Sequence, residues 1–176
     1  MMVEADNPFW DFSLAVYARE GVPAACLRLQ DRQGVDVNML LFCCWTAQSA
    51  AVRLEKDALA AIADRIAPWK AEIVEPLRAA RRDLKPGFDG FSPAGCDALR
   101  EKIKALELEA EKLQQDALFL AFQKMAETGD RMATTGERLE IARTNVDMYL
   151  SAYATRIDDA AREDMAYVID RAFDAA

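Results

Sequence analysis

The chain has 176 residues, with 22 Lys and Arg against 30 Asp and Glu, and its formal net charge is −8. It contains no histidine, which excludes Ser-His-Asp triads, Cys-His pairs, His-ligated metals and histidine acid-base catalysis. Its 33 Ala outnumber its 22 Val, Ile and Thr. Because Ala, Leu, Glu, Arg and Lys lose little side-chain freedom in a helix, this composition predicts an all-α protein.

The totals suit a single domain spanning residues 1–176, since domains commonly run to about 100–200 residues. A pI near 4.7 argues against nucleic-acid binding, which needs a basic surface. The longest uncharged run, Val37–Val52, is shorter than the roughly 20 apolar residues of a membrane span. The acidic start of the chain lacks the pattern of a signal peptide. We therefore expect a soluble cytoplasmic protein with no membrane span and no nucleic-acid partner.

The four cysteines are Cys26, Cys43, Cys44 and Cys96, and they form no CxxC motif. Cys43 and Cys44 are neighbours on a helical pattern and therefore point in different directions. No histidine is present to complete a zinc site. We interpret the cysteines as small buried hydrophobic residues in a reducing compartment, and we expect no metal and no cofactor.

The first part of the chain, about residues 8–52, predicts short helices. Asn7-Pro8 is typical of an N-cap followed by proline at the first helical position, and Gly21 of a helix end. A second short helix opens at Pro23 and closes at Gly34. Asp36 then caps a third helix that is apolar on nearly every side, which predicts burial inside the domain.

The second part, about residues 54–176, predicts long helices. Its first helix is amphipathic, and we expect a break at Pro68 and a kink near Pro76 because interior proline removes a backbone donor. Residues 86–92 form the clearest loop, after which Ser92-Pro93 starts the longest helix. A final acidic helix covers about 157–174. The prediction is an all-α bundle of about seven helices with a long C-terminal helical hairpin.

The longest helix carries a coiled-coil seam between Leu99 and Leu120. Its members alternate in steps of four and three: Leu99, Ile103, Leu106, Ala110, Leu113, Ala117 and Leu120. We favour an intramolecular role for this seam in the hairpin core, with a homodimer interface as the alternative. The carboxylates of the same helix, Glu101, Glu107, Glu109 and Glu111, alternate with lysines, so we interpret them as ordinary solvated surface.

Polar residues within the apolar N-terminal part form the first candidate site. They are Asp11, Tyr17, Asp31 and Asn38, together with Ser13, Gln30 and Asp36. Buried polar groups need partners, so these residues either cap helices and satisfy the core or line a pocket. We favour the structural interpretation. A hard-metal site from Asp31, Asp36 and Asn38 is a weaker hypothesis because the spacing matches no known oxygen-rich loop.

A basic stripe forms the second candidate site. Arg78, Arg81, Arg82 and Lys85 stand at i, i+3, i+4 and i+7, and therefore share one helix face. Four like charges repel one another, so the face calls for an anion. That anion could be a phosphate, an acidic partner, or this chain's own acidic end at Asp158, Asp159, Glu163 and Asp164. We favour an intramolecular or solvated role.

The N-terminal segment resembles a known family. Residues 9–17 (FWDFSLAVY) are similar to the signature of an uncharacterised bacterial, specifically proteobacterial, domain-of-unknown-function family. Residues 21–45 and 69–85 are similar to further parts of it, and residues 145–150 to its tail. The resemblance covers about residues 8–125. It implies a cytoplasmic protein of about this length with no assigned activity, and it carries over no catalytic residue.

These observations favour a protein that works by binding rather than by catalysis. The Gly-rich phosphate loops and the HExxH, GxSxG and SxxK motifs are absent. Our leading hypothesis is a binding or regulatory module whose basic stripe recognises an acidic protein partner or a phosphate-bearing small molecule. The alternative is an enzyme or small-ligand carrier with a pocket among the N-terminal helices, lined by Asp11, Tyr17, Asp31 or Asn38.

Overall fold

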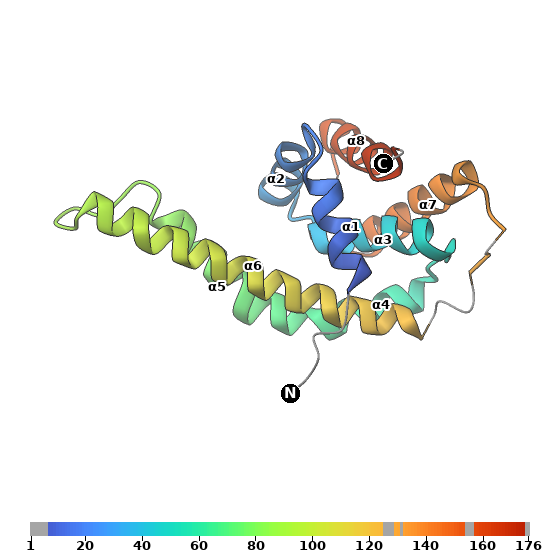
Figure 1. Ribbon diagram of the computed structural model, residues 1–176, viewed down its shortest axis with the longest axis horizontal. Helices are drawn as coiled ribbons and strands as arrows, with labels where there is room; N and C mark the ends of the chain where they lie inside the picture. The colour runs from blue at the N-terminus through green and yellow to red at the C-terminus, as the bar shows by residue number, and fades with distance from the viewer. Residues whose placement is uncertain (1–6, 125–128, 131, 154–156, 175–176) are drawn as a thin grey trace.

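The computed structural model is an assembly of helices, and it describes residues 7–124, 129–130, 132–153 and 157–174 (Figure 1). The acidic first six residues lie outside the described part. In chain order the elements are α1 (Pro8–Tyr17), α2 (Val22–Gln33), α3 (Val37–Ala50), α4 (Lys56–Trp69), the π-helix η1 (Lys70–Val74), α5 (Glu75–Asp83), α6 (Pro93–Gln123), α7 (Thr135–Tyr153) and α8 (Asp159–Phe173). Because α4, η1 and α5 run on without interruption, the described elements make seven helical segments. The all-α fold class is confirmed.

The N-terminal helices follow the predicted signals except at the end of α1, which stops at Tyr17, so that Gly21 precedes α2 as its N-cap instead of ending α1. The side chain of Asn7 accepts hydrogen bonds from the backbone N–H groups of Phe9 and Trp10, at 3.1 and 3.3 Å. Asp36 caps α3 in the same way by accepting from Asn38 N at 3.0 Å. Gly34 ends α2 with φ of +66°, a left-handed conformation that glycine adopts without steric cost.

Helix α3 lies at the centre of the molecule, as its apolar sequence predicts. Its residues from Met39 to Ala47 are all buried. It packs against α7 along its length and also contacts α1, α6 and α8. The indole ring of Trp45 lies 5.2 Å from the ring of Phe9 and 4.3 Å from that of Phe122, centroid to centroid. This aromatic cluster joins α1 and α6 to the central helix.

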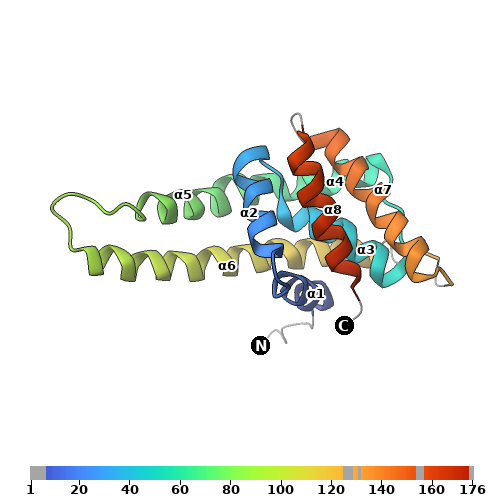
Figure 2. The same ribbon diagram turned by 90° about the horizontal axis from the view of Figure 1, so that it is seen from above.

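The long hairpin consists of α4, η1 and α5 on one side and α6 on the other, and its distal end projects away from the other helices (Figures 1 and 2). The turn between α5 and α6 includes the predicted loop at 86–92. The hairpin occupies the middle of the chain, because α7 and α8 follow it. Helix α7 returns to pack on α3, and α8 packs on α2.

The predicted break at Pro68 is wrong, because α4 continues through this residue to Trp69. The irregularity comes one turn later, in the π-helix η1, whose backbone bond runs from Glu75 N–H to the carbonyl of Lys70. Pro76 follows directly and has no N–H to donate to the preceding turn. A π-turn before this proline therefore allows the helix to continue with its register shifted by one residue.

The leucines of the predicted coiled-coil seam are not in the hairpin core. Leu99, Leu106, Leu113 and Leu120 are 49%, 51%, 55% and 54% exposed, although Ala110 is buried. The buried face of α6 lies beside this line and carries polar residues among the apolar ones: Cys96, Glu107, Ala110, Gln114, Gln115, Leu118 and Phe122. The favoured role of these four leucines in the intramolecular hairpin core is therefore wrong, because they are half-exposed.

Candidate ligand-binding cavity

A cavity of about 160 Å³ lies between α1, the junction of α2 with α3, the η1–α5 segment, and α6. Its apolar walls come from six side chains: Trp10, Leu14, Val37, Leu41, Val74 and Leu108. Its polar lining comes from ten residues: Ser13, Tyr17, Gln30, Asp36, Asn38, Lys70, Arg78, Glu111, Gln114 and Gln115. An apolar hollow with a few converging polar groups is the usual form of a small-molecule site.

Asp36, which lines the cavity, contacts four elements: α3, α6, η1 and α7. Its Oδ1 caps α3, while its Oδ2 accepts from Gln114 Nε2 at 3.1 Å and lies 3.3 Å from Lys70 Nζ. The backbone N–H of Asp36 donates to the hydroxyl of Tyr149 on α7 at 3.0 Å. Lys70 is the first residue of η1, so the π-helix is the segment that presents this ammonium group to α3. Such π-turns occur frequently at functional sites.

Asn38 and Gln115 form a second polar contact across the cavity. Gln115 Nε2 donates to Asn38 Oδ1 at 2.8 Å, joining α6 to α3. Gln115 is only 3% exposed. Its remaining atom, Oε1, is buried and accepts no hydrogen bond from any residue in the described part of the chain. A buried amide oxygen without a donor is rare and requires an explanation.

A buried arginine forms the third polar group. Arg78 is 6% exposed, and its guanidinium holds three carboxylates: Glu107 at 3.1 Å, Glu75 at 3.1 Å and Glu111 at 2.7 Å. Arg81 also donates to Glu107. Burial alone would raise the pKa of the Glu107 carboxyl, but the hydrogen bonds from Arg81 and Arg78 hold it below its usual value. Burial raises the pKa of Glu111 despite its contact with Arg78.

The four residues of the predicted basic stripe lie in different environments. Arg78 lines the cavity and Arg81 lies on Glu107. Arg82 is half-exposed, with Nη1 3.6 Å from Asp31 Oδ1, and Lys85 is exposed at the end of the hairpin. The carboxylates facing Arg78 and Arg81 therefore come from α5 and α6. The acidic C-terminal residues serve elsewhere: Asp164 pairs with Arg28, and Asp158 caps α8.

The four predicted pocket residues separate into two pairs. Tyr17 and Asn38 line the cavity, whereas Asp11 is exposed on α1 and Asp31 lies outside with Arg82. Burial raises the pKa of Tyr17 to about 12, so its phenol is protonated at neutral pH. In the described part of the chain, no group of three or more Asp, Glu, Cys or His is arranged to hold a metal ion.

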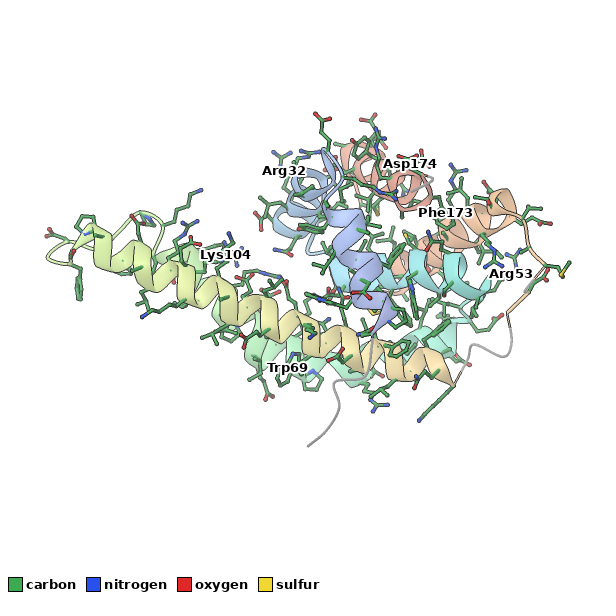
Figure 3. The ribbon with its side chains drawn as sticks, in the orientation of Figure 1. Arg32, Arg53, Trp69, Lys104, Phe173 and Asp174 are labelled. Atoms are coloured by element: carbon green, nitrogen blue, oxygen red, sulfur yellow. The ribbon has the colours of Figure 1, made fainter. Side chains whose placement is uncertain are left out.

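Sequence reasoning missed several cavity residues, chiefly Lys70, Glu111, Gln114 and Gln115. The interpretation of the α6 carboxylates as solvated surface is wrong for Glu107, which is 6% exposed. Gln114 and Gln115 form an adjacent pair of uncharged polar residues between Leu113 and Leu118, and this pair was the available signal. Trp69, at the end of α4, also bonds across the hairpin: its Nε1 donates to the carbonyl of Ala110 at 3.0 Å (Figure 3).

The cysteines are buried free thiols, as their sequence context predicts. Burial raises the pKa of Cys26 and of Cys44 to about 12, so neither thiol forms an appreciable thiolate at neutral pH. None of the helices in the described part of the chain combines the length and the apolar character that a bilayer span requires.

Residues 8–118 match the family described as "Protein of unknown function (DUF2390)". The chain belongs to this family. All the residues that line the cavity, from Trp10 to Gln115, lie within the matched segment, whereas α7 and α8 lie beyond it. Searches of the curated proteins and of the solved structures find no match to this chain.

Proposed function

We propose that this protein binds a small organic molecule in the cavity between α1, α3, η1 and α6. The observation that carries the proposal is the convergence of polar groups from distant parts of the chain inside an apolar shell. Gln114 and Gln115 meet Asp36 and Asn38 across 78 and 77 residues of sequence. Such groups cost stability when they are buried, and a site that orients a ligand is a reason to retain them.

The arginine contacts favour this proposal over recognition of an acidic partner through the basic stripe. Arg78 is buried and neutralised by three carboxylates, and Arg81 shares one of them. A guanidinium already held by carboxylates has little to offer to an external anion. Arg82 and Lys85 are left as the accessible part of the stripe, one of them beside Asp31. Two exposed cations are an ordinary solvated surface.

We propose binding without chemical turnover. The phenol of Tyr17 has a pKa of about 12, so it is a poor general base at neutral pH. The carboxyl of Glu111 has a raised pKa, which would suit acid-base chemistry, but one of its oxygens is held by Arg78 at 2.7 Å. A ligand carrier or a ligand-sensing module is therefore the better description of the site.

A pair of exposed leucines provides the test. Leu14 lines the cavity and is 48% exposed, whereas Leu27 is 51% exposed on α2 and lies outside it. A panel of uncharged, cationic and anionic fragments is titrated into the full chain, with amide chemical shifts as the measurement. We expect fragment binding that Leu14→Trp weakens at least about tenfold, because the indole fills the cavity mouth. Leu27→Trp is the matched control and should bind like the parent.

Two outcomes would reject the proposal. If no fragment of any charge shifts the resonances of α1, η1 and α6, the cavity does not bind small molecules. If fragments bind equally well to Leu14→Trp and to the parent, the bound site lies elsewhere. Melting temperatures of both variants show that loss of binding is not loss of folding, and both leucines are half-exposed, so each tryptophan should be tolerated.

A second proposal concerns the line of exposed leucines on α6. We infer that it pairs with the same line of a second copy in antiparallel orientation, since four half-exposed leucines at seven-residue spacing repeat along one straight helix. That orientation places Leu99 opposite Leu120 and brings Lys102 near Asp116 of the other copy, which are opposite charges. Light scattering should give a dimer that Leu106→Glu converts to a monomer. A parent chain that is monomeric at all concentrations would exclude this homodimer.

A further inference from the structure

We infer that the ligand of the cavity carries a positively charged hydrogen-bond donor, and that it is a small primary ammonium compound with an apolar body. This inference rests on the proposed function and assigns the chemical class of its ligand. It is argued from the hydrogen-bond acceptors left open in the cavity, from the balance of charge around it, and from its size.

Two residues of α6 that line the cavity, Glu111 and Gln115, each have a side-chain oxygen that can accept a hydrogen bond from a ligand. Gln115 Oε1 is buried and has no donor among the described residues. Glu111 accepts from Arg78 through Oε1 and has a second carboxylate oxygen, Oε2, on a side chain that is 26% exposed. The two residues are four positions apart on one helix, so their side chains lie side by side on the same face. A group with several N–H bonds, such as an ammonium, can donate to both oxygens at once.

The charged groups around the cavity are not balanced. Seven of them contact an opposite charge, in two separate groups: Lys70 with Asp36, and Arg78 and Arg81 with Glu75, Glu107 and Glu111. Of these, Asp36, Lys70, Arg78 and Glu111 line the cavity itself, and the others do not. Four negative charges against three positive charges leave one carboxylate in excess. An anionic ligand such as a phosphate would increase that excess, whereas a single cation would neutralise it.

The rest of the lining specifies the body of the ligand. Trp10, Leu14, Leu41, Val74 and Leu108 supply the apolar part of the same lining. A volume of about 160 Å³ is close to that of a cavity known to hold benzene, which sets the ligand at roughly six to ten non-hydrogen atoms. The indole of Trp10 also offers an aromatic face, on which a cation or a flat ring is stabilised.

The experiment uses three probes of similar shape and different charge: benzylammonium, benzyl alcohol and benzoate. Each is titrated into the full chain at pH 7, with amide chemical shifts and calorimetry as the measurements. We expect benzylammonium to bind at least about tenfold more tightly than benzyl alcohol, and benzoate to bind most weakly. Only the ammonium probe satisfies both open acceptors and the excess negative charge.

Two variants locate the effect, and a third is the matched control. Glu111→Gln removes the excess charge and should weaken benzylammonium at least about fivefold, while leaving benzyl alcohol nearly unchanged. Gln115→Met removes the open oxygen at similar volume and should weaken both probes that can donate. Glu109→Gln makes the same change of charge on the same helix, two positions from Glu111 and on the exposed side, and should bind all three probes like the parent.

The outcomes distinguish this inference from the proposed function. If the fragment panel binds but benzyl alcohol or benzoate binds as tightly as benzylammonium, the ligand class is wrong and the cavity remains a binding site. If Glu109→Gln weakens benzylammonium as much as Glu111→Gln does, the effect is the overall charge of the chain and the site is rejected. If no probe and no panel fragment binds, the proposed function fails and this inference fails with it.

Discussion

Replacing Arg78 by methionine should destabilise the fold strongly at neutral pH. Arg78 is 6% exposed and bridges carboxylates on α5 and α6. Without it, Glu107 keeps Arg81, but Glu111 loses the cation that faces it. Removing one partner of a buried ion pair costs about 3–5 kcal/mol. We expect about 3 kcal/mol because Glu111 is partly solvated, which corresponds to a fall of roughly 6–12 °C in melting temperature for a chain of this size.

Urea unfolding followed by circular dichroism measures this loss, and Arg82→Met is the matched control. Arg82 lies one helical turn away, is half-exposed and approaches Asp31 only to 3.6 Å, so its loss should cost less than about 0.5 kcal/mol. The Arg78→Met penalty should shrink as the pH falls toward 4, because protonation removes the charge left on Glu111. If the two variants are equally stable at pH 7, the ion-pair network contributes nothing and Arg78 is available to an external anion.

Three further changes test the fold and its pH dependence. Asn145 is 1% exposed, and its side chain accepts from Leu54 N and donates to the carbonyl of Val52. Asn145→Ala should therefore lower the free energy of unfolding in urea by about 2–4 kcal/mol. A loss below about 1 kcal/mol would show that water replaces these hydrogen bonds. Gly21 has φ of +79°, and a Cβ there would lie 2.6 Å from the hydroxyl of Tyr167, so Gly21→Ala should cost at least about 1–2 kcal/mol and lower the melting temperature measurably. Burial raises the pKa of the Glu111 carboxyl, so this carboxyl stays protonated to higher pH in the folded chain than in the unfolded chain. Its protonated form therefore contributes to the free energy of unfolding at low pH, and this contribution is lost as the pH rises from about 4.5 through the raised pKa. Glu111→Gln should therefore gain stability relative to the parent over that interval, whereas parallel stability curves from pH 4 to 7 would contradict the shift.

The helix boundaries follow from local signals, and these could be predicted from the sequence. Asn7 and Asp36 accept from backbone N–H groups of the first turn, and such caps depend only on residues two or three positions away. The apolar character of α3 likewise requires burial wherever the chain places it. The prediction for Pro68 was wrong, because α4 continues through this residue to Trp69, and the irregularity stands instead in the π-helix before Pro76.

The candidate site depends on pairings that no local pattern contains. The heptad pattern identifies the leucines of α6 as the apolar line but does not say which face meets the remaining helices. That face instead contains Glu107, Gln114 and Gln115, each hydrogen-bonded to a group from another element. The partners of the two glutamines lie more than 70 residues away in sequence. Hydrophobic periodicity cannot predict such contacts because it carries no information on which distant polar groups are complementary.

The burial of Gln115 in place of an apolar residue argues for a role in binding rather than in stability. A buried amide oxygen without a donor destabilises the folded chain, so removing it should not weaken the fold. Gln115→Met should therefore be at least as stable as the parent in urea, since Asn38 is half-buried and water can replace the lost donor. The same variant should bind benzylammonium more weakly. Residues that limit stability while supporting function are expected at binding sites. A Gln115→Met chain that loses about 2 kcal/mol of stability would show that Gln115 serves the core and not a ligand.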